Sequence, residues 1–224
     1  MATTDYDFVH TRNQIIQRAF RIVGALSNGQ NLTAEKLQQG IEALNSMVKS
    51  WQSETCFLWT LEPLTFTTTA TDYTYVLDDD PQVIAIDGAW WVNGDYDDPI
   101  DRIAWRTYQD IDDKTKTGKP IYIAIDNKRA PTAYIWPIPD ATYTIKILAI
   151  TKLQDFDSAS GTGDFPVRFT QALEYGLADL LADEYGLPLG ERQLLSQKAQ
   201  KYFQLARRSD RDRQDYMVVR GAFD

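Results

Sequence analysis

The residue types that carry out most enzyme chemistry are few in this chain. It holds one histidine, His10, and one cysteine, Cys56. A zinc cluster of nitrogen and sulfur ligands needs about four such residues, so none is available. We expect His10 to be an exposed residue ahead of the first helix, and Cys56, beside Phe57, to be a small buried apolar residue rather than a reactive thiol. No nucleophile elbow, phosphate-binding loop or dinucleotide fingerprint occurs.

Carboxylates are plentiful, with 32 Asp and Glu in the chain, but their grouping fits turns better than catalysis. Residues 78–80 are three Asp before a proline, which indicates a solvated turn. A loop rich in Gly and Pro is expected to hold four more: Asp95, Asp97, Asp98 and Asp101. Their spacing does not match a calcium-binding loop, because the glycine and the distal Glu are misplaced. The sequence therefore predicts no catalytic residue, metal or cofactor, and a protein that is not an enzyme.

Composition limits the partners. The chain has 224 residues, 43% of them hydrophobic, which suits one large or two small globular domains. No run of apolar residues is long enough for a membrane span, and the N-terminus lacks a secretory pattern, so we expect synthesis in the cytoplasm. The net charge is −9. Tight binding to DNA normally needs a basic patch, so direct DNA binding is not expected, and an acidic surface would repel DNA.

Helical periodicity occurs in the first and the last part of the chain. A helix is expected over residues 11–26, with Thr11 and Gln14 as a capping box, and a second over 33–53 with Thr33 as its cap. The second helix has an apolar seam: Leu37, Ile41, Leu44, Val48 and Trp51. After a flexible connector at 156–164, two more helices are expected over about 166–185 and 191–207. Each helix hairpin has an uncovered apolar stripe, so we predict that the two pairs form a discontinuous four-helix bundle.

The middle of the chain changes to the pattern of strands. Alternating or β-branched segments occur near 64–66 and 73–77 and at 83–92, 121–125, 133–138 and 142–150. Residues 110–116 form either a short helix or a loop. The fold class is therefore α+β, with an antiparallel β sandwich or barrel inserted into the bundle. The expected domains are 1–56 with 157–208 for the helices, 57–156 for the β module and 209–224 for an extended C-terminal tail.

Two features suggest contact with another molecule. Trp90 and Trp91 are adjacent in an expected strand, so they point to opposite faces: either both help to fill the β core, or one of them faces a partner. The C-terminal tail places apolar residues beyond a charged run that includes Arg211 and Arg213, and burying unpaired charge is unfavourable. Such a tail either frays or docks on another protein. Its candidate docking residues are Arg211, Arg213, Tyr216, Met217, Val218, Val219 and Phe223.

Several stretches carry a family resemblance. These are RAFRIVG at 18–24, LNSMVKSWQ at 44–52, GKPIY at 118–122 and YIWPIPD at 134–140. They resemble head-to-tail adaptor proteins of short-tailed bacteriophages, which include packaged-DNA stabilisation and tubular tail ring proteins. The resemblance covers most of residues 12–206 and contains no catalytic signature.

The resemblance implies a structural virion protein of the neck or tail. It implies a homo-oligomeric ring, usually a dodecamer, beneath the portal protein, which extends the DNA channel and supports tail nozzle or tail fibre proteins. DNA would pass through the lumen without specific binding, and the C-terminal tail would dock on the portal. An alternative from a different class is a carbohydrate-binding or hydrolytic tail component that uses the aromatic β module.

Overall fold

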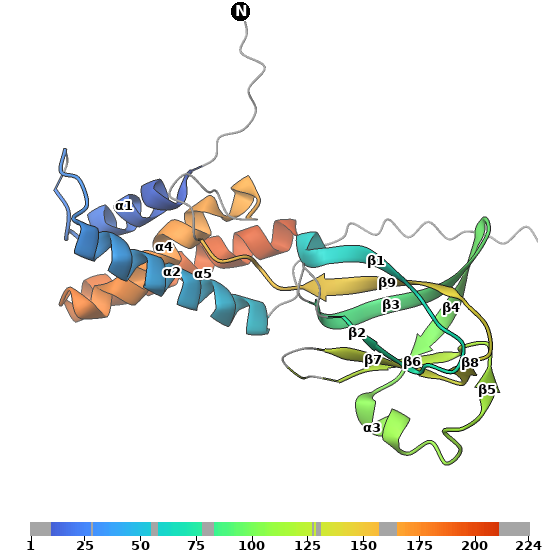
Figure 1. Ribbon diagram of the computed structural model, residues 1–224. Coiled ribbons are helices and arrows are strands. Elements are labelled where there is room, and N and C mark those ends of the chain that lie inside the picture. Colours follow the sequence, from blue (N-terminus) through green and yellow to red (C-terminus); the bar gives the residue numbers. More distant parts are fainter. Residues whose placement is uncertain are drawn as a thin grey trace, which may run out of the picture. The chain divides into compact units, whose positions relative to one another are not determined.

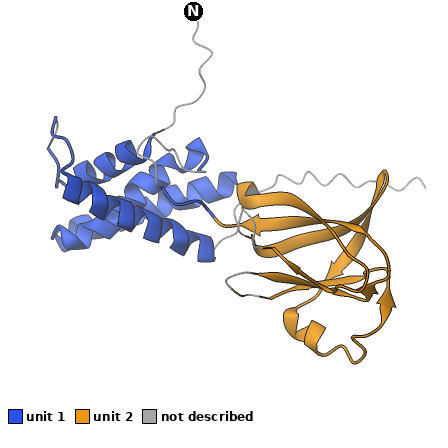
Figure 2. Ribbon diagram, in the orientation of Figure 1, with its two compact units in different colours: residues 1–58, 153–224 blue, residues 59–152 orange. Residues whose placement is uncertain are grey.

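The computed structural model describes residues 10–27, 29–54, 58–77, 83–126, 128, 131–156 and 165–210. The chain divides into two compact units: residues 1–58 with 153–224, and residues 59–152 (Figure 2). The first unit is helical and the second is built on strands (Figure 1). The fold is therefore α+β, as the change of sequence period predicted.

The helical unit holds α1 (Arg12–Ile22), α2 (Ala34–Glu54), the 3-10 turn η2 (Val167–Phe169), α4 (Thr170–Glu184) and α5 (Leu189–Ser209). The predicted capping box of α1 is present: Gln14 N–H donates to the Thr11 hydroxyl, and Thr11 N–H donates to the Gln14 side chain at 2.8 Å. α2 has its predicted cap, since Lys36 N–H donates to the Thr33 hydroxyl at 3.3 Å.

The first helix ends earlier than the sequence pattern indicated. Gly24 has a φ of +72°, a left-handed conformation that glycine adopts without strain. Its N–H donates to the Arg21 carbonyl, and Ala25 N–H donates to the Phe20 carbonyl. This hydrogen-bond pattern is a Schellman motif, which ends α1 at Ile22 rather than at residue 26. The glycine therefore ends the helix and does not merely weaken its last turn.

The helices of this unit pack around α4, which contacts α1, α2 and α5. Fully buried side chains from several helices meet there: Ile16, Phe20, Leu44, Phe169, Leu173 and Leu177. α2 approaches α1 closely at Gly40, where a Cβ atom would lie 2.4 Å from Ile16 Cγ2. The more specific arrangement of a four-helix bundle stays a prediction.

A short returning segment belongs to the helical unit. Three side chains of α2 hold residues 153–156. Gln52 accepts from Leu153 N–H, Asn45 accepts from Phe156 N–H, and Lys49 lies 3.0 Å from the Asp155 carboxylate. The boundary between the units accordingly falls at 152/153 in this part of the chain.

The 3-10 turn η1 (Leu58–Thr60) leads from the first unit into the second, which contains nine strands and one short helix within its described residues. The strands are β1 (Leu61–Thr67), β2 (Thr74–Val76), β3 (Val83–Asn93), β4 (Tyr96–Arg102), β5 (Thr117–Gly118), β6 (Tyr122–Ile125), β7 (Thr132–Trp136), β8 (Ile138–Pro139) and β9 (Thr144–Thr151). The helix α3 (Trp105–Gln109) follows β4, so residues 110–116 are a loop.

Seven strands form one sheet in the order β1-β9-β3-β4-β6-β7-β2. All pairs in it are antiparallel except β4 with β6, and β5 pairs with β8 in a separate parallel pair. The sheet is curled, because Phe66 on one edge strand and Tyr75 on the other have ring centroids 5.2 Å apart. Alternate residues of β9 point into the resulting core, where Ile145, Ile147 and Ala149 are fully buried.

The acidic segment after Gly94 is a strand and not the loop that the sequence suggested. A tight turn at Gly94, with a φ of +61°, joins β3 to β4, and Trp91 pairs with Asp98. Two lysines neutralise the carboxylates of β4. Lys146 lies 2.6 Å from Asp97, and Lys119 lies 2.9 Å from Asp98. These cations come from distant parts of the sequence, so local composition alone indicated a loop.

Candidate functional site

The two adjacent tryptophans of β3 lie on opposite faces of the curled sheet. Trp91 packs against the core of the β unit. Its ring centroid is 5.7 Å from that of Tyr143, and the Lys119 ammonium lies 3.2 Å from the ring centroid. A cation at this distance over an indole ring is favourable. Trp91 is therefore half-buried and engaged with groups of its own unit.

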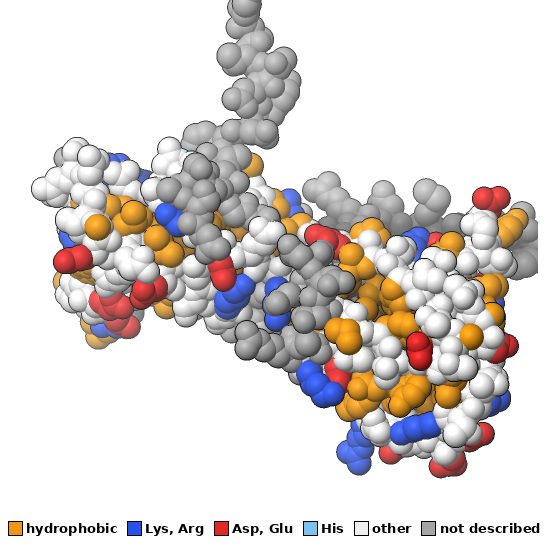
Figure 3. Space-filling view, viewed as in Figure 1, with side chains coloured by type: hydrophobic (Ala, Val, Ile, Leu, Met, Phe, Trp, Pro, Cys, Tyr) orange, Lys and Arg blue, Asp and Glu red, His pale blue; other side chains and the backbone are white. Residues whose placement is uncertain are grey.

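Trp90 lies on the outer face of the sheet. Its ring covers Gly88, since a Cβ atom on Gly88 would come within 2.5 Å of the indole. Lys146 lies 5.8 Å from its ring centroid and pairs with Asp97. Leu148 and Ile150, half-buried residues of the neighbouring strand β9, share this outer face by alternation. Hydrophobic side chains also gather on the face of this unit seen in Figure 3.

His10 is not the exposed residue that its position near the N-terminus suggested. Its Nδ1 atom lies 2.7 Å from the Glu174 carboxylate of α4, and Glu174 is buried. These two residues, with Arg18 and Arg168, border a cavity of about 520 Å³. Pairing with a distant carboxylate holds His10 against the helical unit.

The start of the charged run behind α5 is also anchored. Asp210 is buried and forms an ion pair with Arg168. The expectation that every residue of this run stays outside the core is wrong at this position, because a distant cation offsets the burial of the carboxylate. The candidate tail residues lie beyond it, outside the described residues: Arg211, Arg213, Tyr216, Met217, Val218, Val219 and Phe223. Cys56 lies outside them as well.

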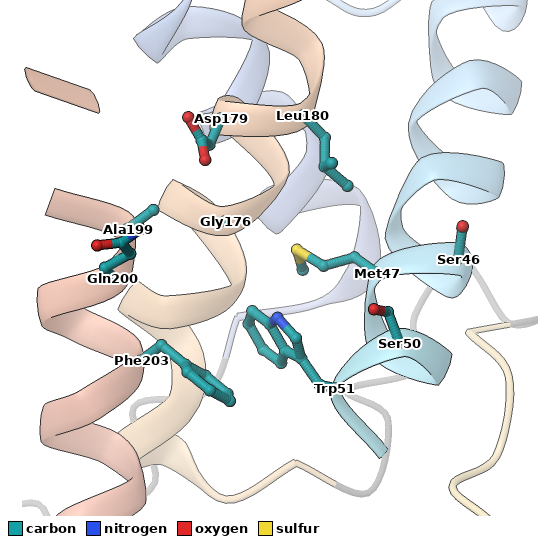
Figure 4. Close-up of a pocket in the computed structure, with 10 residues that line it drawn as sticks. All are labelled: Ser46, Met47, Ser50, Trp51, Gly176, Asp179, Leu180, Ala199, Gln200 and Phe203. Atoms are coloured by element: carbon teal, nitrogen blue, oxygen red, sulfur yellow. The ribbon is translucent and has the colours of Figure 1, made fainter. Parts of the chain in front are cut away.

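A second cavity, of about 330 Å³, opens between α2, α4 and α5 (Figure 4). Its apolar part is formed by Met47 and Trp51 of α2 and Phe203 of α5, with the Trp51 and Phe203 rings 4.5 Å apart. Gly176 of α4 leaves the space open, because a Cβ atom there would lie 2.8 Å from Met47 Sδ. Leu180 borders this interhelical pocket and is 48% exposed.

One carboxylate borders the same pocket. Asp179 of α4 is half-buried. Burial raises the pKa of the Asp179 carboxyl above its ordinary value, although the hydroxyl of Ser196 and the charge of Arg192 act in the opposite direction. An apolar pocket with a single partly desolvated carboxylate suits an apolar group that carries a nearby cation.

The other flank of α5 presents basic and apolar side chains together. Positions about one turn apart share a helix face, which places five exposed residues on this α5 stripe: Leu194, Lys198, Lys201, Leu205 and Arg208. Leu194 and Leu195 are adjacent in α5. In the structure only Leu195 is buried and Leu194 is 60% exposed, because adjacent residues of a helix cannot share one face.

The described ranges contain no group of three or more His, Cys, Asp or Glu residues placed to hold a metal ion. The helices within these ranges also lack one long and apolar enough to cross a membrane. What the described chain does present is surface suited to protein contact, namely the pocket and the α5 stripe.

The comparison with family models shows the class of protein. The model of the SU10 adaptor protein family matches residues 11–221. The chain therefore belongs to this family of phage head-to-tail adaptors and has a structural role as a phage adaptor. No curated protein matches the chain. The resemblance seen in the sequence is confirmed.

Proposed function

We propose that this chain forms a ring that joins the portal of the capsid to the tail and continues the channel through which DNA leaves. The observation that carries the proposal is the family match, which covers both units and extends past α5. A dodecameric ring beneath the portal is the assembly that similar adaptors form. The protein would accordingly be located in the neck of the virion.

The charge of the chain supports the proposed channel. The net charge of the chain is −9. DNA binds proteins chiefly through cations that displace its counterions. An acidic lumen would repel the phosphates, so DNA would pass without specific binding.

The end of α5 supports a role for the C-terminal tail in docking on the portal. The Arg168–Asp210 ion pair fixes the last described residue against the helical unit. Arg211 and Arg213 follow, and then the apolar residues Tyr216–Val219 and Phe223. A tethered apolar segment with two cations suits a groove on another protein that has acidic borders. Anchoring its first residue lowers the entropy that docking would remove.

The tail is tested by a chain that ends at Asp210, so that α5 and the Arg168–Asp210 pair remain intact. Full-length and shortened chains are mixed with portal rings, and binding is measured by sedimentation and by particle images. We expect the full-length chain to form rings on the portal and the shortened chain to bind at least about tenfold more weakly. Unchanged affinity of the shortened chain would show that the tail is not the portal anchor.

A matched pair of full-length variants separates the two parts of the tail. Serine replaces Tyr216, Met217, Val218, Val219 and Phe223 in one variant, and glutamine replaces Arg211 and Arg213 in the other. If the apolar residues provide the docking energy, the serine variant loses affinity at all salt concentrations. The glutamine variant then loses affinity mainly at low salt, where exposed charges are least screened.

The β unit is proposed to contact tail nozzle or tail fibre proteins, or the next subunit, through the outer sheet face around Trp90. Replacing Trp90 by Ala removes an outward aromatic, whereas replacing Trp91 by Ala removes a side chain packed on the core. Weaker tail attachment by the Trp90 variant, with a normal fold, would support this surface. Saturable binding of host glycans that is lost in the same variant would favour a carbohydrate-binding tail component instead.

A further inference from the structure

The helix α5 has two unlike flanks. Residues 200 and 203 face the interhelical pocket, whereas residues 194, 201 and 205 lie about half a turn around the helix on the opposite side. The buried residues Leu195, Ala199 and Ala206 lie between the two flanks and hold α5 on its own unit. The pocket and the α5 stripe therefore open in different directions from one helix.

The α5 stripe combines exposed leucines, which are unfavourable to leave in water, with lysines, whose charge can select a partner. Leu194 is 60% and Leu205 49% exposed, and they flank Lys198 and Lys201 along the same face. Leu194 and Leu205 are about 16 Å apart along the helix axis, at a rise of 1.5 Å per residue. A lysine thus stands about one turn from each exposed leucine.

The pocket offers the complement of this arrangement. Trp51 and Phe203 line its apolar part, Leu180 adds an exposed apolar border, and Asp179 supplies the carboxylate. In Figure 4, Met47, Trp51 and Phe203 extend into the space between the helices, and Asp179 lies at its other end on α4. A leucine in the apolar part would bring a lysine on the same helix face toward Asp179.

We propose that the α5 stripe of one copy docks into the pocket between α2, α4 and α5 of the next copy. This inference rests on the proposed ring and names the two surfaces that join its subunits. A contact between two different surfaces of identical chains is heterologous, and it closes into a ring when the rotation between copies permits. Surfaces on opposite flanks of one helix leave each copy free to bind one neighbour on each side.

Charge complementarity favours a second copy over other occupants. The helix α5 carries five basic residues and one acidic residue, whereas α4 carries four acidic residues and no basic one. Glu174 is buried against His10, and Asp183 pairs with Arg192 of its own α5. The carboxylate that a docked basic stripe would meet at the pocket is therefore Asp179. Nucleic acid would pair with the lysines but would leave the two leucines exposed.

The test exchanges the charges across the proposed contact in the full-length chain. One variant is Asp179→Lys, another is Lys198→Glu with Lys201→Glu, and a third combines all three changes. Lys114→Glu with Lys116→Glu in the β unit serves as a charge-matched control. Self-association without portal is followed by sedimentation velocity over a range of concentrations, and circular dichroism verifies each fold.

We expect the wild type and the control variant to associate alike. Asp179→Lys and the double glutamate variant should each need at least about tenfold more protein to associate, because like charges would face each other. The combined variant should recover. An equimolar mixture of the two defective variants should associate better than either alone, since both contacts between unlike variants are complementary.

Two results would overturn the inference: a wild type that stays monomeric at all concentrations tested, or folded variants that associate as the wild type does. Portal binding is measured separately on the same proteins. Loss of portal binding with intact self-association would contradict the proposed function while leaving the contact between copies in place. If folded variants bind the portal normally and also associate as the wild type does, the contact between copies is contradicted and the proposed function stands.

Discussion

The close approach of α1 and α2 at Gly40 yields a prediction whose size follows from the structure. A Cβ atom at this position would lie 2.4 Å from Ile16 Cγ2 and 3.2 Å from a ring carbon of Phe20. Favourable carbon contacts lie at about 3.5–4.0 Å, so the first distance requires a shift. Ile16 and Phe20 are fully buried, and a β-branched side chain has little rotamer freedom in a helix. Neither neighbour has room to move aside.

Two opposing terms decide the effect of Gly40→Ala. Alanine is favoured over glycine inside a helix by about 1 kcal/mol. Overpacking a filled core costs about 1–3 kcal/mol, and the short distance to a buried atom places this case in the upper part of that range. We therefore expect Gly40→Ala to lower the free energy of unfolding by about 1–2 kcal/mol.

The matched control is Gly190→Ala in the first turn of α5. No atom lies within 4 Å of the position that a Cβ would take there, so only the helix preference remains. We expect this variant to be as stable as the wild type or more stable by up to about 1 kcal/mol. Urea unfolding followed by far-ultraviolet circular dichroism compares the two variants. If Gly40→Ala proves as stable as Gly190→Ala, the reasoning from the helix contact fails.

Three further variants test local interactions by thermal or urea unfolding. Thr11→Ala removes the capping box of α1 and should cost about 1 kcal/mol, whereas an unchanged midpoint would show that the cap is not needed. Phe20→Ala empties a fully buried site and should cost about 3–5 kcal/mol, and a loss below about 1 kcal/mol would contradict this packing. For Asp126, burial raises the carboxyl pKa, but hydrogen bonds from Lys128 and from Thr132 N–H lower it more, so the folded pKa lies below the ordinary value. The stability it gives is present above the unfolded pKa of about 4 and is lost as pH falls through the folded pKa. Asp126→Asn should therefore be less stable than the wild type at neutral pH, with a difference that shrinks in acid; a difference independent of pH would refute the assignment.

Local signals in the sequence were sufficient for the helix starts and for most strands. Thr11 and Gln14 formed the predicted capping box because its hydrogen bonds join residues only three apart. Alternation along residues 144–151 placed the β9 residues correctly, since side chains of a strand point to opposite faces in turn. Gly186 follows the last turn of α4 and has a left-handed conformation, with a φ of +66°. Such a residue ends a helix, and glycine adopts this conformation readily.

The features that the sequence did not reveal depend on residues far apart in the chain. Glu174 pairs with His10 across 164 positions, and Arg168 pairs with Asp210 across 42. The strand β4 depends on Lys146 and Lys119 beside its aspartates. The exposed leucines of α5 had a weak signal, because Leu194 and Leu205 share a face with Lys198 and Lys201 and not with Leu195.

The two proposals make compatible use of the charge of the chain. Lys198, Lys201 and Arg208 are exposed on the α5 stripe, and a channel lined by them would hold DNA by releasing its counterions. If the stripe instead lies against the pocket of the next copy, these cations are turned away from the channel, and the remaining surface of a chain of net charge −9 is more acidic. The same contact removes two leucines from water, which favours assembly. A ring joined in this way would therefore gain both its cohesion and its low affinity for DNA from the orientation of one helix.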